Sequence, residues 1–254
     1  AKKFTGESSP RYLLRVAEAP RDHTGLGTGT QLGLAVARAI ATIEGNRLSA
    51  VELAASTGRG LRSAIGVHGF EHGGFIADGG RGRGSDAIAP LLCRLEVPED
   101  WRFVLAAPIG GLGISGNAEE ESFRFLDSSS EASAHALCHA LFLGMAPALA
   151  EKDIHSFGDA LYEYGVRSGE CFKKAQGGVF ASLEIAELVE FLRSEGVRGA
   201  GQSSWGPTVY AVTDGDDRAG HIARRIANRC GPDKVQVIVT RPLNRGAEVS
   251  RPED

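Results

Sequence analysis

A glycine-rich loop, GLGTGT at Gly25–Thr30, carries the residue types that bind phosphate groups. Its three glycines allow tight backbone turns that expose amide N–H groups, and its two threonines add hydroxyl donors. Apolar residues at helical spacing begin at Leu32, so the loop leads into the start of a helix, whose positive end attracts anions. No Lys-Ser or Lys-Thr follows the glycines, which excludes a Walker A loop. The pattern favours a phosphate site over a merely structural turn.

A second glycine turn, GQSSWGPTVYAV at 201–212, leads into an apolar run that is typical of a strand. Trp205 lies within this turn, between Ser204 and Gly206. A large ring in a tight turn either packs into the core as a wedge or offers a flat surface to an aromatic or sugar ligand. Both interpretations of Trp205 remain open from the sequence.

Two other patterns resemble functional motifs less closely. His135 and His139 have the spacing at which two residues of one helix share a metal, but without a third ligand nearby a half-buried helix face is favoured. GLGISG at Gly111–Gly116 matches the glycine spacing of dinucleotide sites. The carboxylates of Glu119–Glu121 would repel a pyrophosphate there, so they are expected to favour a helix N-terminus or to hold a magnesium ion.

The elements that must position these turns are helices and strands without a strict alternating order. Helices are expected after Thr30 and at 49–57, 117–126, 131–149, 157–166, 185–194 and 217–229, and strands at 11–19, within 73–80, and at 102–107, 208–213 and 234–240. This mixture predicts an α+β fold. A boundary near Pro98 would separate one domain at 1–98, holding the phosphate loop, from a second at 99–254.

Composition narrows the class of protein. The 254 residues include 28 Lys and Arg against 32 Asp and Glu, a net charge of −4 that argues against a broad nucleic-acid surface. The four cysteines lack zinc spacing, and the longest apolar stretch, Ala134–Ala150, is interrupted and falls short of a membrane span of about 18 residues. We therefore expect a cytoplasmic protein. The chain opens at Ala1 and its only methionine is Met145, which predicts a preceding N-terminal segment.

Several motifs together resemble the GHMP kinase superfamily. HTGLGTGTQLGLAVA at His23–Ala37 is similar to its phosphate loop, GQSSWGPTVYAV is similar to its third motif, and RGLRSAIGVHGFEHGGF at Arg59–Phe75 aligns with the stretch that holds S-G-I-D in the kinases. Within the superfamily, GLGTGTQL, RGLRSAIG, WRFVLAAP and GQSSWGP resemble the β-ribofuranosylaminobenzene 5′-phosphate synthase family. The resemblance extends from about Pro20 to Val239.

The resemblance implies a fold and a reaction. It implies an N-terminal domain like domain 2 of ribosomal protein S5 and a ferredoxin-like C-terminal domain. It further implies an enzyme that joins phosphoribosyl pyrophosphate to 4-aminobenzoate or 4-hydroxybenzoate, with loss of pyrophosphate and CO2, in tetrahydromethanopterin biosynthesis. Such enzymes resemble cytoplasmic homodimers that need Mg2+.

One departure from the kinase pattern bears on the chemistry. Arg62 aligns where the kinases hold a carboxylate base, and an arginine with a pKa above about 12 cannot serve as one. Formation of a C-riboside needs no such base, because CO2 rather than a proton leaves the attacking carbon. Two alternatives remain: a small-molecule kinase that uses another base, and a non-catalytic ligand-binding homologue.

The expected site residues fall into three groups. The catalytic, anion-holding group is Arg59, Arg62 and Ser63, with the two arginines expected on one helical face. The phosphate-binding group is His23, Gly25, Leu26, Gly27, Thr28, Gly29 and Thr30. The substrate-binding group is Gln202, Ser203, Ser204, Trp205 and Gly206.

Overall fold

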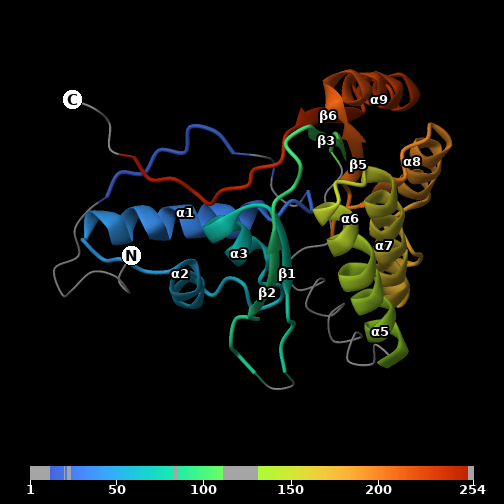
Figure 1. Ribbon diagram of the computed structural model, residues 1–254. Helices are drawn as coiled ribbons and strands as arrows, with labels where there is room; N and C mark the ends of the chain where they lie inside the picture. The colour runs from blue at the N-terminus through green and yellow to red at the C-terminus, as the bar shows by residue number, and fades with distance from the viewer. Residues whose placement is uncertain (1–11, 20, 22–23, 83–84, 111–130, 251–254) are drawn as a thin grey trace. The chain divides into compact units, whose positions relative to one another are not determined.

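The computed structural model describes residues 12–19, 21, 24–82, 85–110 and 131–250 (Figure 1). The chain forms two compact units. The first comprises Ala1–Asp22, Gly27–Glu96 and Leu243–Asp254, and the second comprises His23–Leu26 and Val97–Pro242. The chain enters the second unit for the four residues His23–Leu26 and returns to the first unit within the glycine loop. It enters the second unit again after Glu96, two residues before Pro98, and returns to the first unit at Leu243.

The first unit packs three helices around a small apolar core and adds a two-stranded sheet. Its elements are α1 (Thr28–Ile43), α2 (Ala50–Thr57), α3 (Ile65–His72), β1 (Phe75–Asp78) and β2 (Leu91–Leu95). The fully or almost fully buried core residues are Leu34, Ala37, Ala41, Ala50, Leu53, Ala54, Val67 and Phe70. Helix α2 begins where the sequence predicts, because Ser49 and Glu52 form a capping box.

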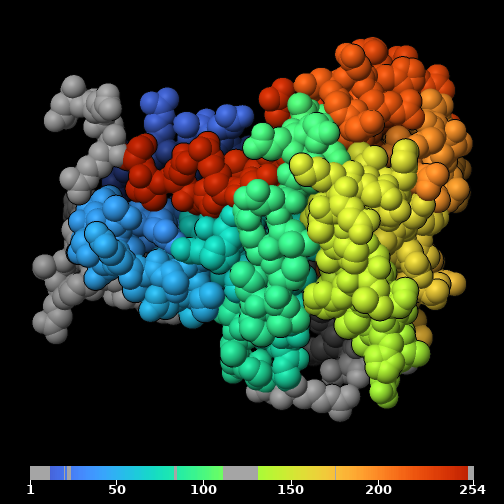
Figure 2. Space-filling model, in the orientation of Figure 1, coloured from blue at the N-terminus to red at the C-terminus, as the bar shows by residue number. Residues whose placement is uncertain are grey.

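Residues 243–250 lie along the first unit as an extended segment (Figure 2). The N–H of Gly74 donates to the carbonyl of Leu243 over 2.7 Å, and the N–H of Ala247 donates to the carbonyl of Phe70 over 2.8 Å. These bonds tie the end of the described chain to α3 and to the loop that follows it.

The second unit has a four-stranded antiparallel sheet in the order β4-β5-β3-β6. The strands are β3 (Trp101–Pro108), β4 (Gly199–Gln202), β5 (Val209–Asp214) and β6 (Val235–Thr240). Helices α8 (Leu183–Ser194) and α9 (Gly215–Cys230) bury their apolar faces against it, sharing one core with Val104, Val209 and Val235 (Figure 1). This strand order is that of a ferredoxin-like sheet, as the resemblance implies.

A continuous helical run precedes α7 (Ile154–Gln176) and consists of α5 (Glu131–His139), a π-helical turn η1 (Ala140–Met145) and α6 (Ala146–Ala150). By length and composition alone, Glu131–Ala150 is apolar enough to cross a membrane, a criterion that core helices of water-soluble proteins also meet. The apolar stretch Ala134–Ala150 was expected to be too short to span a membrane. In length this expectation was wrong, because the helix begins at Glu131, ahead of the apolar residues.

Other sequence expectations also need correction. The strand expected at 11–19 is absent over the described residues 12–19, where Leu13 is 99% exposed; alternation forms a strand only where a partner strand exists. Helix α7 exceeds the predicted 157–166 at both ends, because Asp153 caps its start and the left-handed Gly177, with a φ of 82°, ends it. Gly158 within it allows close packing against the backbone of Gly199. The elements α3, β2 and β4 were not predicted, and the helix expected at 117–126 lies outside the described residues.

Candidate active site

Helix α1 begins directly after Gly27, and its N-terminus is open to an anion. Gly27 adopts a left-handed φ of 69°, no side chain caps the helix, and the first turn contains no acidic residue. Over the described chain, the N–H groups of Thr28 and Gly29 donate no hydrogen bond, whereas those of Thr30 and Gln31 both donate to the Gly27 carbonyl. Two donors at the positive end of a 16-residue helix are thus left for a ligand.

Arg59 lies beside this helix start, in the loop between α2 and α3. Its Nη1 is 3.5 Å from the position that a Cβ on Gly29 would occupy. The side chain is exposed, and no carboxylate among the described residues pairs with it. A guanidinium next to free amide donors is an arrangement that suits phosphate or carboxylate groups.

Arg62 and Ser63 belong to the same loop, but the loop is not helical, so the expectation that Arg59 and Arg62 share a helical face was wrong. The Oγ of Ser63 accepts a hydrogen bond from the N–H of Ile65 over 3.3 Å and so supports the start of α3. The carboxylate of Asp78 accepts from the backbone N–H of Ala64 over 2.9 Å. Ser63 therefore has a structural role, and the exposed Arg62 is held by a loop that is fixed at Ala64.

The first half of the glycine loop, Thr24–Leu26, packs within the second unit. The hydroxyl of Ser203 donates to the carbonyl of Gly25 over 2.8 Å. Gly25 has a left-handed φ of 79°, and a Cβ there would lie 2.4 Å from the Ser203 carbonyl oxygen. Only glycine satisfies both the backbone angle and this close approach. His23 lies outside the described residues.

The turn between β4 and β5 uses most of its polar groups to hold its own shape. Oε1 of Gln202 accepts from the N–H of Ala181 over 2.7 Å, and its Nε2 donates to the Ser204 carbonyl over 2.9 Å. The N–H of Gly206 donates to the Ser203 carbonyl over 2.9 Å. Of the five residues predicted to bind substrate, Ser204 alone is exposed, with a left-handed φ of 52°.

Trp205 is 6% exposed and packs edge-on against Phe172 of α7, with ring centroids 4.3 Å apart. Behind the turn, burial raises the pKa of the Tyr210 phenol well above its usual range, and the neighbouring Tyr164 adds to the shift. A Cβ on Gly201 would lie 2.5 Å from the Tyr210 hydroxyl, so glycine leaves room for the phenol. These aromatic supports were not predicted, because no local spacing links them to the turn.

The described residues contain no group of three His, Cys, Asp or Glu that would hold a metal ion. The imidazole of His68 is buried and bonds the carbonyl of Ala89 over 2.8 Å, which is a structural role. His135 is exposed beside Glu131, and Glu119–Glu121 lie outside the described residues.

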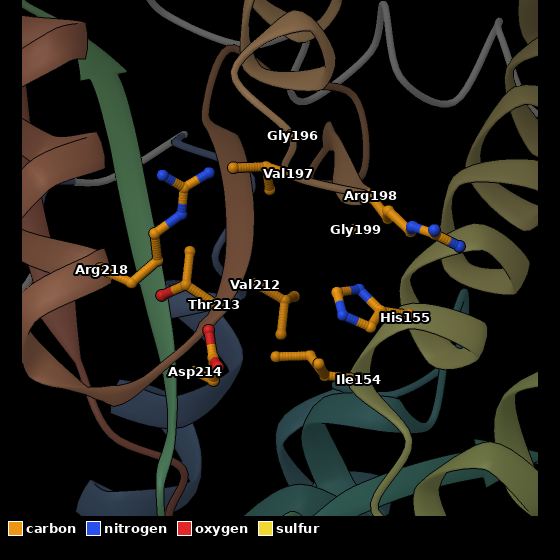
Figure 3. A pocket seen from close by; sticks show the side chains of 10 residues that line it. All are labelled: Ile154, His155, Gly196, Val197, Arg198, Gly199, Val212, Thr213, Asp214 and Arg218. Atoms are coloured by element: carbon orange, nitrogen blue, oxygen red, sulfur yellow. The ribbon is translucent and has the colours of Figure 1, made fainter.

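A small cavity of about 160 Å3 lies elsewhere in the second unit, where β4 begins and β5 ends (Figure 3). Its cationic lining groups already have partners: Arg198 pairs with Asp159 over 2.8 Å, and Arg218 donates to the carbonyl of Glu195. It lies at the opposite end of the strand pair from the Gln202–Gly206 turn, and none of the predicted site residues lines it.

Several proteins of known name are similar to this chain over most of its length. Residues 145–233 match the family model described as GHMP kinases C terminal. The chain is 37% identical over 236 residues to the β-ribofuranosylphenol 5′-phosphate synthase of Methanothermobacter thermautotrophicus, spanning 89% of this chain and 69% of that protein. It is 34% identical over 242 residues to the protein of the same name from Archaeoglobus fulgidus, spanning 89% and 72%.

Solved structures with the same fold share little sequence. Homoserine kinase from Cytophaga hutchinsonii superposes with a TM-score of 0.61 at 15% identity, covering 90% of this chain and 68% of that one. Galactokinase from Lactococcus lactis, solved with galactose, gives a TM-score of 0.62 at 13% identity, covering 89% and 68%. These similarities confirm the predicted α+β fold of the GHMP kinase type.

Proposed function

The chain belongs to the β-ribofuranosylphenol 5′-phosphate synthase family, as its motifs predicted, and on this basis we propose that it is a glycosyltransferase that joins phosphoribosyl pyrophosphate to a 4-substituted benzoate. The ring carbon that carries the carboxylate attacks C1 of the ribose, and the C–O bond to pyrophosphate breaks. The bond to the carboxylate then breaks, CO2 leaves, and its electron pair returns to the ring. The products are a C-riboside 5′-phosphate, pyrophosphate and CO2.

The relatives' name favours one of the two benzoates. A phenol product retains a ring hydroxyl, and decarboxylation of 4-hydroxybenzoate at the attacking carbon leaves that hydroxyl in place. The aromatic amine would instead come from 4-aminobenzoate. We propose 4-hydroxybenzoate as the preferred acceptor.

The barrier of this reaction lies in charge separation, because pyrophosphate departs from a ribose with oxocarbenium character. Fixed amide donors and guanidinium groups stabilise such charge without reorganising. The observation that carries the proposal is the open start of α1 with the guanidinium of Arg59 beside it. We assign the pyrophosphate to the N–H groups of Thr28 and Gly29 and to Arg59, with Arg62 as the second cation.

A kinase would need a general base to take a proton from the attacking hydroxyl. The carboxylate of Asp78 reaches the loop that holds Arg62, but its two oxygens accept from the N–H groups of Ala64 and Gly80. A carboxylate whose oxygens both accept backbone hydrogen bonds stabilises the loop and is not positioned as a general base. The arrangement therefore favours the synthase over the kinase.

Cofactor and assembly remain part of the proposal. We propose that Mg2+ arrives with the pyrophosphate group, because this ion is usually held by substrate phosphates and only one or two carboxylates. We also propose that the protein acts as a cytoplasmic homodimer in tetrahydromethanopterin biosynthesis.

The direct test incubates the protein with phosphoribosyl pyrophosphate, Mg2+ and each benzoate in turn. Release of CO2 and pyrophosphate in equal amounts, faster with 4-hydroxybenzoate, is the expected result. Consumption of ATP with a small-molecule hydroxyl would identify a kinase instead. Tight binding without turnover would identify a non-catalytic homologue.

Arg62 provides the mutational test. Arg62→Ala should lower turnover by roughly 10²–10³, the usual loss for a group that stabilises transition-state charge. Arg62→Lys should lose much of this as well, because a point charge does not reproduce the planar guanidinium. Thermal unfolding should change little, since the side chain is exposed. Near-normal turnover in folded Arg62→Ala would remove Arg62 from the catalytic group.

A further inference from the structure

We infer that Gly29 and Gly33 are positioning residues that seat the Arg59 side chain along α1, an inference that rests on the proposed anion site. A Cβ on Gly33 would lie 3.4 Å from Nε and 3.6 Å from Cγ of Arg59, and one on Gly29 would lie 3.5 Å from Nη1. The arginine stem therefore crosses the helix at Gly33, and its guanidinium reaches toward Gly29 at the helix start.

The small size of Gly29 and Gly33, rather than their backbone freedom, leaves room for the Arg59 side chain. Residues four apart lie on one helix face, so Gly29 and Gly33 leave a flat strip free of side chains. Neither has a left-handed φ, so an ordinary residue would suit the backbone. A Cβ at either position would meet Arg59 at an ordinary van der Waals distance, so the strip excludes side chains larger than alanine.

The strip formed by Gly29 and Gly33 holds the Arg59 guanidinium in a defined position before a ligand binds. The backbone of Arg59 is fixed, because its N–H donates to the carbonyl of Ala54 over 2.9 Å. A guanidinium that already lies along the helix loses less conformational freedom on binding an anion. Spacing within one helix, TGTQLG, is the signal that would have revealed this role from the sequence.

Calorimetry with inorganic pyrophosphate tests the effect on binding. Gly33→Leu should weaken the affinity about tenfold or more, as Arg59→Ala should, because the leucine occupies the path of the arginine stem. Gly69→Leu makes the same change in α3 of the same unit, where a Cβ meets nothing within 4 Å, and should keep wild-type affinity. The double variant Gly33→Leu/Arg59→Ala should bind no more weakly than Arg59→Ala alone. Wild-type affinity in Gly33→Leu, or a further loss of affinity in the double variant, would contradict the inference that Gly33 positions Arg59.

A second measurement needs no ligand and so separates the seat from the proposed function. In the NMR spectrum, the Nε–H of Arg59, identified by its loss in Arg59→Lys, should show a nuclear Overhauser effect to the Hα protons of Gly33. The effect should disappear in Gly33→Leu while helix α1 stays folded by its amide signals. Absence of the effect in the wild type overturns the seat. Its presence in a protein that does not bind pyrophosphate supports the seat and counts against the anion site.

Discussion

The start of α1 in the first unit and the β4–β5 turn in the second are both glycine motifs, yet they use their polar groups in opposite ways. At α1, the N–H groups of Thr28 and Gly29 and the guanidinium of Arg59 have no hydrogen-bonding or ionic partner among the described residues. In the turn, Gln202 and Ser203 are already bonded to the backbone. The first arrangement keeps donors for a ligand, and the second makes a rigid support. A shared glycine pattern thus does not imply a shared role.

The strongest test of the rigid support is Gly25→Ala. Its Cβ would meet the Ser203 carbonyl oxygen at 2.4 Å with a left-handed φ, so we expect a loss of about 2–5 kcal/mol in the free energy of unfolding. Gly27→Ala has the same backbone penalty but open space, and should lose only about 1–2 kcal/mol. Urea denaturation followed by circular dichroism measures both. Equal losses at the two positions would show that the contact with Ser203 contributes nothing.

Trp205→Leu should have the next largest effect. Removing a buried ring that packs on Phe172 should lower the free energy of unfolding by about 1–3 kcal/mol. The same variant decides whether the indole also meets the ligand, because Trp101 remains as a fluorescent reporter. If substrates change the emission of the wild type but not of Trp205→Leu, the indole contributes to the pocket. A change that persists in the variant comes from Trp101, and Trp205 is then a packing residue alone.

The smallest effect is expected for an ion pair in the second unit. Nη2 of Arg102 donates to Oδ2 of Asp216 over 3.0 Å, and this guanidinium holds the pKa of the carboxyl below its usual range. A lowered pKa stabilises the fold above the unfolded value near 4, and the contribution is lost as the pH falls through the folded pKa. The Asp216 side chain is 62% exposed, so water screens the pair and limits its contribution.

Thermal unfolding at several pH values checks this pair. The melting temperature of Asp216→Asn should lie below that of the wild type at pH 7, and the gap should close as the pH falls below about 4. Asp217→Asn removes a carboxylate from the same helical turn without removing a bond to Arg102 and is the control. A gap that is independent of pH would assign the loss to packing instead of charge.

The local features of this protein follow from short-range patterns in its sequence. The capping box at Ser49 and Glu52 and the presence of glycine turns before α1 and before β5 were predicted from residues within a few positions of one another. The combination of motifs was also sufficient to predict the family and the α+β fold, which the relatives confirm.

Contacts between segments far apart in the sequence were not predictable from these local patterns. The bond between Ser203 and Gly25 joins residues 178 positions apart, and the path of Arg59 along α1 depends on how two helices pack. The alternating residues 12–19 form no strand, because strand formation requires a partner that local spacing does not specify. Local propensity fixes which conformations a segment favours, and packing between distant segments fixes which polar groups remain available for a ligand.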